Sequence, residues 1–252
     1  MTPEKGDLAD PQMAWMVARA LAVVSNQQSA AAAVSPGIKR HLLENGLMSK
    51  AQSYQGRLDA SYQAERLRMA EGLPTKDERL RQGLEGLRTQ LFSHGTALDR
   101  ATWLATYRLA GGTVSAPEEE SVLQAASEAF TRNVTLQNVQ IWAQQVDVLQ
   151  VLDEPIPAFT VEPWAAQSPE ARSARNVLVL GLSRAGRLGL LADRPAAAQL
   201  LTEADEQLKA GTVTAASLAL DAASAVGWVT DAATSQRMKK QLDARTLSDT
   251  VG

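Results

Sequence analysis

The sequence predicts an all-α protein: a helical bundle of about eight or nine helices, with one long central helix and a Pro-rich connector to a smaller C-terminal helical unit. Three observations lead to this prediction. The 252 residues are 45% hydrophobic but only 4% aromatic, and the apolar share consists largely of Ala and Leu, which lose little entropy in a helix. Apolar residues recur at helical spacing. Start and stop signals divide the chain into segments of helical length.

The composition excludes several classes of function. The formal net charge is −3, so no overall positive field attracts nucleic acid or anionic lipid. Because the chain has no Cys, it has no disulfides, no thiol catalysis and no Cys-ligated metal. Its two histidines, His41 and His94, stand in neither a His-x-x-x-His nor a Glu-x-x-His spacing. We therefore expect no catalytic residues, no metal and no cofactor.

The first predicted helix contains the apolar run Met13–Val24. Acidic residues outnumber Lys5 before it and Arg19 interrupts it, which is not typical of a secretory signal. Its 12 residues are too few to span a bilayer. We expect a core helix; the alternative is an amphipathic segment that docks peripherally on a membrane or a protein partner through Trp15. We expect a cytoplasmic protein with no transmembrane span, and association with a virion or a molecular machine stays open.

Apolar spacing and a capping signal predict two further helices before residue 95. Residues 49–71 place apolar side chains roughly in helical phase. Thr75 and Glu78 form a Thr-x-x-Glu capping box, which predicts that the next helix starts near Lys76. One apolar stripe of that helix consists of four leucines, Leu80, Leu84, Leu87 and Leu91.

The strongest start signal precedes the predicted long helix. Thr96 first opens a helix over 97–110. Ser115 then combines a capping side chain with a proline and acidic residues in the first turn. After that turn neither Gly nor Pro occurs up to Leu152, so the sequence predicts one continuous helix. The β-branched residues around Val134 weaken this prediction slightly.

Four prolines in residues 153–169 exclude a helix or a central strand there. We interpret this segment as an extended connector whose aromatic residues lie against a surface. It separates an N-terminal helical bundle, 1–152, from a C-terminal helical unit, 170–252. The helices predicted in that unit cover about 168–192, 195–210, 214–226 and 231–247.

Small and leucine residues recur along two predicted helices of the C-terminal unit, at Ala204, Leu208, Gly211, Ala216, Leu220 and Ala223. In this spacing the segment resembles one helical hairpin of the tetratricopeptide repeat, without that motif's Trp and Tyr and without a second copy. The resemblance implies a helix pair that presents a protein-binding surface.

Charge is distributed in blocks along the chain. Residues 37–110 carry 12 basic and 8 acidic residues, 111–170 carry 1 and 9, and 171–252 carry 10 and 8. Unlike blocks attract each other, either within one chain or between copies. Neutralisation within one chain is the simpler of these two expectations.

The predicted helix over 168–192 carries the candidate interaction site. Gly181 and Gly186 have the spacing of a phosphate loop, but Arg187 and Leu188 replace its Lys and its Ser or Thr, so no nucleotide site is expected. Small residues at Gly181, Ala185 and Gly189 face one way, where another helix can approach, and arginines face the other. Arginine favours bidentate partners such as carboxylates or phosphates over plain solvation, and the alternative is a solvated face. The candidate interaction residues are Arg172, Arg175, Arg184, Arg187 and Arg194, called the Arg stripe below, with Trp15 and Trp164.

Three classes of function stay open. The favoured class is a non-enzymatic structural or adaptor protein that mediates protein–protein assembly with a partner or with itself, for example in a secretion, conjugation or virion structure. The second is a nucleic-acid-associated protein that uses the basic segment 37–110 and the Arg stripe. The third is a ligand-binding or enzymatic bundle with a pocket that the sequence does not reveal.

Overall fold

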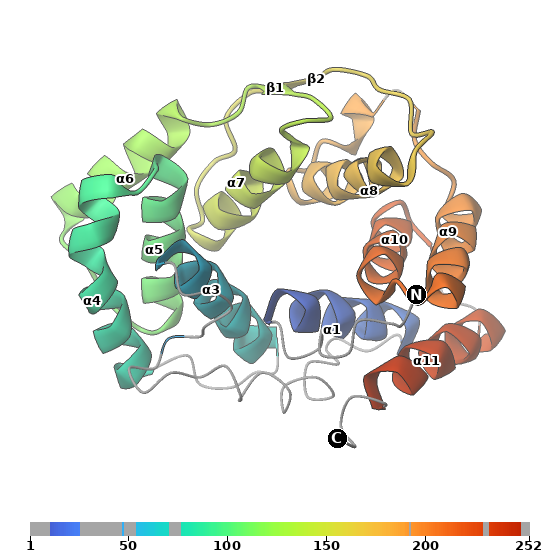
Figure 1. Cartoon of the computed structure of the whole chain (residues 1–252). Coiled ribbons are helices and arrows are strands. Elements are labelled where there is room, and N and C mark those ends of the chain that lie inside the picture. Colours follow the sequence, from blue (N-terminus) through green and yellow to red (C-terminus); the bar gives the residue numbers. More distant parts are fainter. Residues whose placement is uncertain are drawn as a thin grey trace. The chain divides into compact units, whose positions relative to one another are not determined.

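The structure is a computed structural model, and it describes residues 11–25, 47, 54–70, 77–191, 193–228 and 232–247. These residues hold ten α-helices, a short 3-10 helix and two strands (Figure 1). The all-α class is therefore confirmed. Within the described ranges, no helix has both the length and the apolar character needed to cross a membrane.

The elements of the first half are α1 (Pro11–Ser25), α3 (Tyr54–Ala70), α4 (Glu78–His94), α5 (Ala97–Leu109), α6 (Ala116–Glu128), β1 (Asn133–Val134) and α7 (Val139–Val151). Those of the second half are β2 (Thr160–Val161), α8 (Pro169–Arg184), η4 (Leu188–Leu190), α9 (Ala197–Ala210), α10 (Val213–Ala225) and α11 (Ala232–Leu247).

Helix packing divides the described residues into two compact units. The first unit contains the described residues of 1–18, 28–129 and 246–252, and the second contains those of 19–27 and 130–245. The expectation that 153–169 connects an N-terminal bundle, 1–152, to a C-terminal helical unit, 170–252, stays a prediction.

In the first unit, α5 packs against α3, α4 and α6. Trp103 of α5 is fully buried, and its indole N–H donates a hydrogen bond to the carbonyl of Leu84 on α4 at 2.9 Å. The Trp103 ring stacks on Tyr107 at a centroid distance of 5.0 Å and meets the edge of Phe92. This aromatic group anchors α4 to α5.

The apolar run of α1 is buried, as expected for a core helix. Val17, Ala20, Leu21 and Val24 are all at most 3% exposed. Burial of these side chains stabilises the fold. Peripheral contact with a membrane through 13–24 stays a prediction.

Helix α4 begins slightly later than the sequence predicts. Its N-cap is Asp77, whose carboxylate accepts a hydrogen bond from the backbone N–H of Leu80 at 3.0 Å, and Glu78 is the first helical residue. The predicted cap, Thr75, lies outside the described residues, as do residues 49–53. Asp77 also receives a hydrogen bond from Arg68 of α3 at 2.8 Å, so this cap ties the two helices together.

Other local signals are confirmed. Thr96 and Asp99 form a complete capping box at the start of α5. The Ser168 side chain caps α8 by accepting from the N–H of Ala171 at 3.1 Å. Gly211 ends α9 in the left-handed conformation, with φ of 84°, which a glycine adopts without strain.

The predicted long helix over 115–152 is wrong. The chain leaves the helix after α6, forms β1 and starts a new helix at α7. Polar side chains bind the backbone of this break: the Asn138 side chain accepts from the N–H of Thr135 at 2.8 Å and donates to the carbonyl of Asn133 at 2.9 Å. Gln145 accepts from the N–H of Thr131 at 2.9 Å. Such side-chain bonds satisfy backbone N–H and C=O groups that have no helical partner. They therefore stabilise the non-helical segment between α6 and α7.

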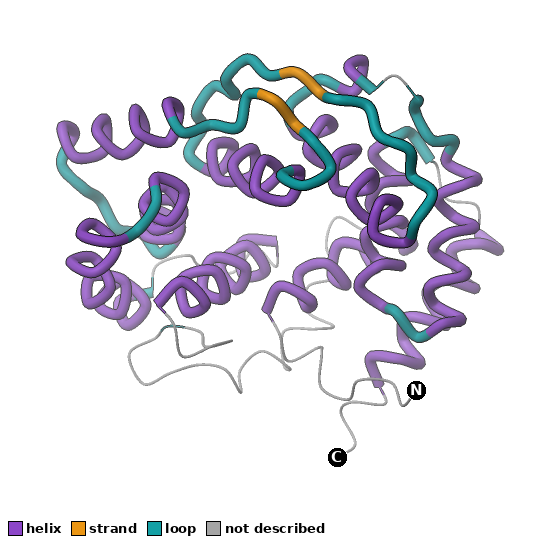
Figure 2. The backbone as a smooth tube through the Cα atoms, turned by 45° about the horizontal axis from the view of Figure 1, so that its top comes forward, coloured by secondary structure: helices purple, strands orange, loops and turns teal. Residues whose placement is uncertain are grey.

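The Pro-rich segment is extended, as predicted, and it lies against other elements. Its strand β2 pairs with β1 in parallel (Figure 2). The N–H groups of Thr160 and Glu162 donate to the carbonyls of Arg132 and Val134, both at 2.8 Å. Phe159 packs against the ring of Trp142, with a centroid distance of 5.0 Å.

In the second unit, α8 packs against α7 and α10, and α9 packs against α10. The α9–α10 pair confirms the predicted helical hairpin, and the five residues Ala204, Leu208, Ala216, Leu220 and Ala223 are buried in it. Its role as a protein-binding surface stays a prediction.

Close packing of α7 on α8 requires Gly181. A Cβ atom at this position would lie 2.3 Å from the ring of the fully buried Trp142, so the absent side chain lets the ring approach, as the sequence predicts. The predicted helix to about residue 192 is wrong, because α8 ends at Arg184 and Gly186 turns the chain with φ of 64°. Gly189 is therefore not part of the small-residue face.

Replacing Gly181 and replacing Gly86 by alanine should have opposite effects on the free energy of unfolding. Gly181→Ala should lower the free energy of unfolding by about 1–3 kcal/mol, because the new Cβ overlaps Trp142. Gly86→Ala is the matched control in α4, where a Cβ meets no atom within 4 Å, and it should raise stability by about 0.5–1 kcal/mol. Urea unfolding measures both, and equal effects would contradict the packing of α7 on α8.

Candidate functional site

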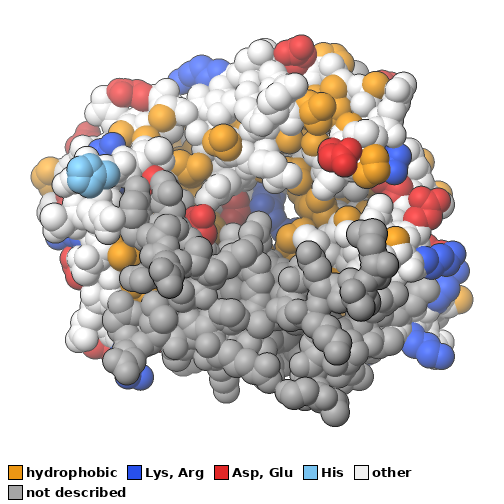
Figure 3. Space-filling view, viewed as in Figure 1, with side chains coloured by type: hydrophobic (Ala, Val, Ile, Leu, Met, Phe, Trp, Pro, Cys, Tyr) orange, Lys and Arg blue, Asp and Glu red, His pale blue; other side chains and the backbone are white. Residues whose placement is uncertain are grey.

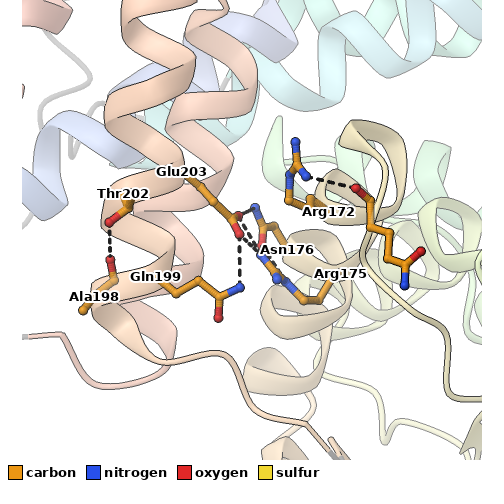
Figure 4. A network of polar contacts seen from close by, with 8 residues as sticks. Arg172, Arg175, Asn176, Ala198, Gln199, Thr202 and Glu203 are labelled. Atoms are coloured by element: carbon orange, nitrogen blue, oxygen red, sulfur yellow. Dashed lines mark hydrogen bonds and ion pairs between the residues drawn. The ribbon is translucent and has the colours of Figure 1, made fainter.

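Arg175 of α8 is held by Glu203 of α9 (Figure 4). The Nη2 atom of Arg175 lies 2.7 and 2.6 Å from the two carboxylate oxygens of Glu203, and each side chain is only 11% exposed. Asn176 accepts a hydrogen bond from Arg175 at 3.1 Å, and Gln199 donates to Glu203 at 3.5 Å. The charge of Arg175 is thus neutralised inside the unit.

Arg184 pairs with the acidic block. Its guanidinium lies 2.8 Å from the carboxylate of Asp147 on α7. In the first unit, Glu118 and Glu119 of the same block pair with the basic segment: Glu118 contacts Arg88 at 2.6 Å, and Glu119 pairs with Arg108. The acidic block is therefore neutralised partly within the chain, from both neighbouring blocks.

The other three members of the Arg stripe share no bonding partner in the described part of the chain. Arg172 donates to the carbonyl of Gln167 at 3.1 Å, and Arg194 donates to the carbonyl of Val226 at 2.8 Å. Arg187 is exposed and lies beyond the end of α8. The stripe is therefore not one continuous cationic surface.

Trp15 belongs to the first unit, whereas the Arg stripe belongs to the second. It is half-buried, and the guanidinium carbon of Arg66 lies 5.1 Å from the centre of its ring. This geometry is that of a cation–π contact, which stabilises α1 against α3.

Three predicted residues, Trp164, Arg175 and Arg194, line one pocket of about 300 Å³ in the second unit. The pocket is bounded by the connector residues 161–166, by α8, and by the segment from η4 to the start of α9. Its apolar lining includes Pro163, Trp164, Leu178, Leu190, Leu191 and Pro195. Its polar lining consists of Glu162, Arg175, Asp193, Arg194 and Gln199.

Sequence reasoning missed Glu162, Asp193 and Leu190 as members of this pocket. Leu190 is 47% exposed, although it is a large apolar residue. The only local signal was Trp164 among the prolines, which indicates a segment packed against a surface. The other side of the pocket comes from residues about 30 positions later in the chain, which only the folded structure brings close.

Charges of both signs are mixed over the described residues on the face shown in Figure 3, where Lys and Arg side chains stand among Asp and Glu side chains. In the basic segment 37–110, Arg68, Arg81, Arg88 and Arg108 each pair with a carboxylate. Such pairing leaves fewer cations for phosphates, so the nucleic-acid alternative has less support.

Two buried carboxylates pair with arginines outside the pocket. Glu65 is 2% exposed and lies 3.0 Å from Arg68; burial raises its pKa to about 7, against the opposing effect of Arg68. Asp221 is 5% exposed and lies 3.2 Å from Arg19, and burial raises its pKa to about 6. Within the described part of the chain, no group of three or more acidic or His side chains is arranged to hold a metal ion.

In comparisons with known proteins, no model of a protein family, no curated protein and no solved structure matches the chain.

Stability should fall as the pH rises through the range in which Glu65 titrates. The folded state keeps the Glu65 proton up to a pKa of about 7, whereas the unfolded chain releases it near 4.5. The free energy of unfolding should therefore drop by about 1–3 kcal/mol across this range. Urea unfolding at several pH values measures the drop, which Glu65→Gln should reduce and Glu120→Gln, at an exposed site, should leave unchanged. A Glu65→Gln protein with the full drop would contradict this assignment.

Removing Arg175 should destabilise the protein far more than removing Arg187. Arg175→Leu leaves the buried Glu203 carboxylate without its partner, which costs about 3–5 kcal/mol. Arg187→Leu, at an exposed site, should change the free energy of unfolding by less than about 0.5 kcal/mol. The double variant Arg175→Leu with Glu203→Leu should recover most of the loss. Equal effects of the two single variants in thermal or urea unfolding would show that Arg175 is a solvated residue.

Proposed function

We propose that the chain is a non-enzymatic helical structural or adaptor protein, and that its second unit binds a protein partner at the pocket next to the Pro-rich connector. The observation that carries the proposal is the pocket itself, which joins an apolar lining to charged residues at its rim. Binding surfaces combine these features, because buried apolar anchors supply affinity and polar groups supply orientation.

The exposure of Leu190 supports this location. A large apolar side chain that is 47% exposed beside a pocket offers contact area to a partner. The volume of about 300 Å³ is at the lower end of the range for small-molecule pockets, about 300–1,000 Å³. It suits one large side chain from a partner surface.

The internal pairing of the arginines supports the same location. Arg175 and Arg184 are neutralised by Glu203 and Asp147. A partner that needed the whole Arg stripe would have to break both ion pairs. A partner at the pocket meets Arg175 already paired and does not disturb either contact.

A small apolar ligand in the same pocket is the second candidate, and the pocket volume is the observation that favours it. The two candidates differ in what a ligand screen shows. A small molecule that raises the melting temperature of the wild-type protein, but not that of a protein with the pocket filled by Ala166→Trp, would favour this second function.

Partner binding should depend on Leu190 and not on an equally exposed apolar residue elsewhere in the unit. Leu190→Asp should reduce the recovery of a specific co-purifying protein at least about tenfold, because a buried charge replaces an apolar contact. Ile141→Asp is the matched control, since Ile141 of α7 is 53% exposed and does not line the pocket. Both variants should keep the wild-type melting temperature.

The measurement is affinity capture from the native host with quantitative mass spectrometry, together with light scattering to detect self-association. The proposal predicts at least one protein, or a second copy of the chain, that Leu190→Asp loses and Ile141→Asp retains. Recovery of the same proteins by all three forms would contradict the proposed function.

A further inference from the structure

We propose that the partner segment is an extended basic peptide, which adds to the open edge of β2 and places a Lys or Arg side chain in the pocket. This inference rests on the proposed function and specifies its partner. It combines three features of the second unit: a free strand edge, an apolar pocket beside it and an excess of carboxylates at the rim.

The strand edge follows from the register of the β1–β2 pair. The N–H groups of Thr160 and Glu162 both point to β1, where they bond to the carbonyls of Arg132 and Val134. Peptide groups of successive residues in a strand point to opposite sides, so the N–H and the C=O of Val161 point away from β1. Among the described residues, no third strand covers this side.

Val161 is also a lining residue of the pocket. A peptide that pairs with the backbone of Val161 therefore runs past the pocket mouth. Extended peptides bind other proteins in this way, with backbone hydrogen bonds supplying affinity and alternate side chains supplying specificity. The neighbouring Pro163 has no N–H, which limits the pairing to a short stretch of the peptide.

The charge of the pocket favours a cation. Glu162 and Asp193 are exposed lining residues, and neither carboxylate has an ion-pair partner among the described residues. Arg175 is neutralised by Glu203, which leaves Arg194 as the one lining cation opposite two carboxylates. One N–H group of Arg194 donates to the carbonyl of Val226, and with two carboxylates against this one cation the net charge of the rim is negative.

The shape of the lining fits a long basic side chain. Lys and Arg bury their methylene stems against apolar surface and keep the charged end at a polar rim. Leu178, Leu190 and Leu191 offer such a surface, and Trp164 adds an aromatic ring that attracts cations. An acidic side chain would be repelled by the carboxylates of Glu162 and Asp193, and a purely apolar side chain would leave both carboxylates without an ion-pair partner.

Defined peptides test this inference on the full chain by calorimetric titration at low ionic strength. The probe is an acetylated and amidated pentapeptide of alternating valine and lysine. One comparison peptide has glutamate in place of lysine, and another keeps lysine but carries N-methyl groups that block pairing along one backbone edge. The probe should bind saturably with 1:1 stoichiometry, and each comparison peptide should bind at least about tenfold more weakly.

Matched variants locate the binding. Glu162→Gln with Asp193→Asn should weaken binding of the lysine peptide at least about tenfold, because both acceptor charges are lost. The control pair, Glu206→Gln with Asp153→Asn, removes two exposed carboxylates of the same unit that do not line the pocket. This control should bind as the wild-type protein does.

The outcomes separate this inference from the proposed function. No binding of the lysine peptide, equal binding of the glutamate or N-methylated peptide, or unchanged binding by the pocket double variant would overturn the inference. If a host partner still depends on Leu190, the proposed function stands and the partner presents another kind of surface. If no partner depends on Leu190 while the lysine peptide binds as predicted, the pocket recognises basic segments but the assembly role fails.

Discussion

The arrangement of the second unit depends on the ion pair between Arg175 and Glu203. Both side chains are largely buried, and a buried charge is costly unless an opposite charge and hydrogen-bond partners accompany it. The pair links the middle of α9 to α8, with Asn176 and Gln199 completing the network. The same contact positions Arg175 in the wall of the pocket and removes its charge from the surface.

The blocks of opposite charge along the chain form ion pairs that link helices within each unit. Glu118 and Asp147 come from the same acidic block, yet the first pairs in one unit with Arg88 and the second in the other unit with Arg184. These contacts reduce the charge available for assembly. The surface that we propose for partner binding is consequently smaller and more apolar than the Arg stripe.

Local signals in the sequence predict local structure well in this chain. Thr96 and Gly211 mark a helix start and a helix end because each acts on backbone groups within a few residues. The break between α6 and α7 was missed because it depends on side chains such as Asn138 bonding to non-helical backbone. The pocket was missed in part because Glu162 and Asp193, which are separated in sequence, come to line one pocket only in the folded chain.

The central claim is that a partner contacts the second unit at the pocket, and photo-crosslinking in the native host tests it most directly. A photoreactive phenylalanine analogue placed at Ala165, an exposed lining residue, should give a discrete crosslinked product. The same analogue at the exposed Ile141 should give none of that product. Identical products from both positions, or no product from position 165 while the partner is captured, would contradict the claim.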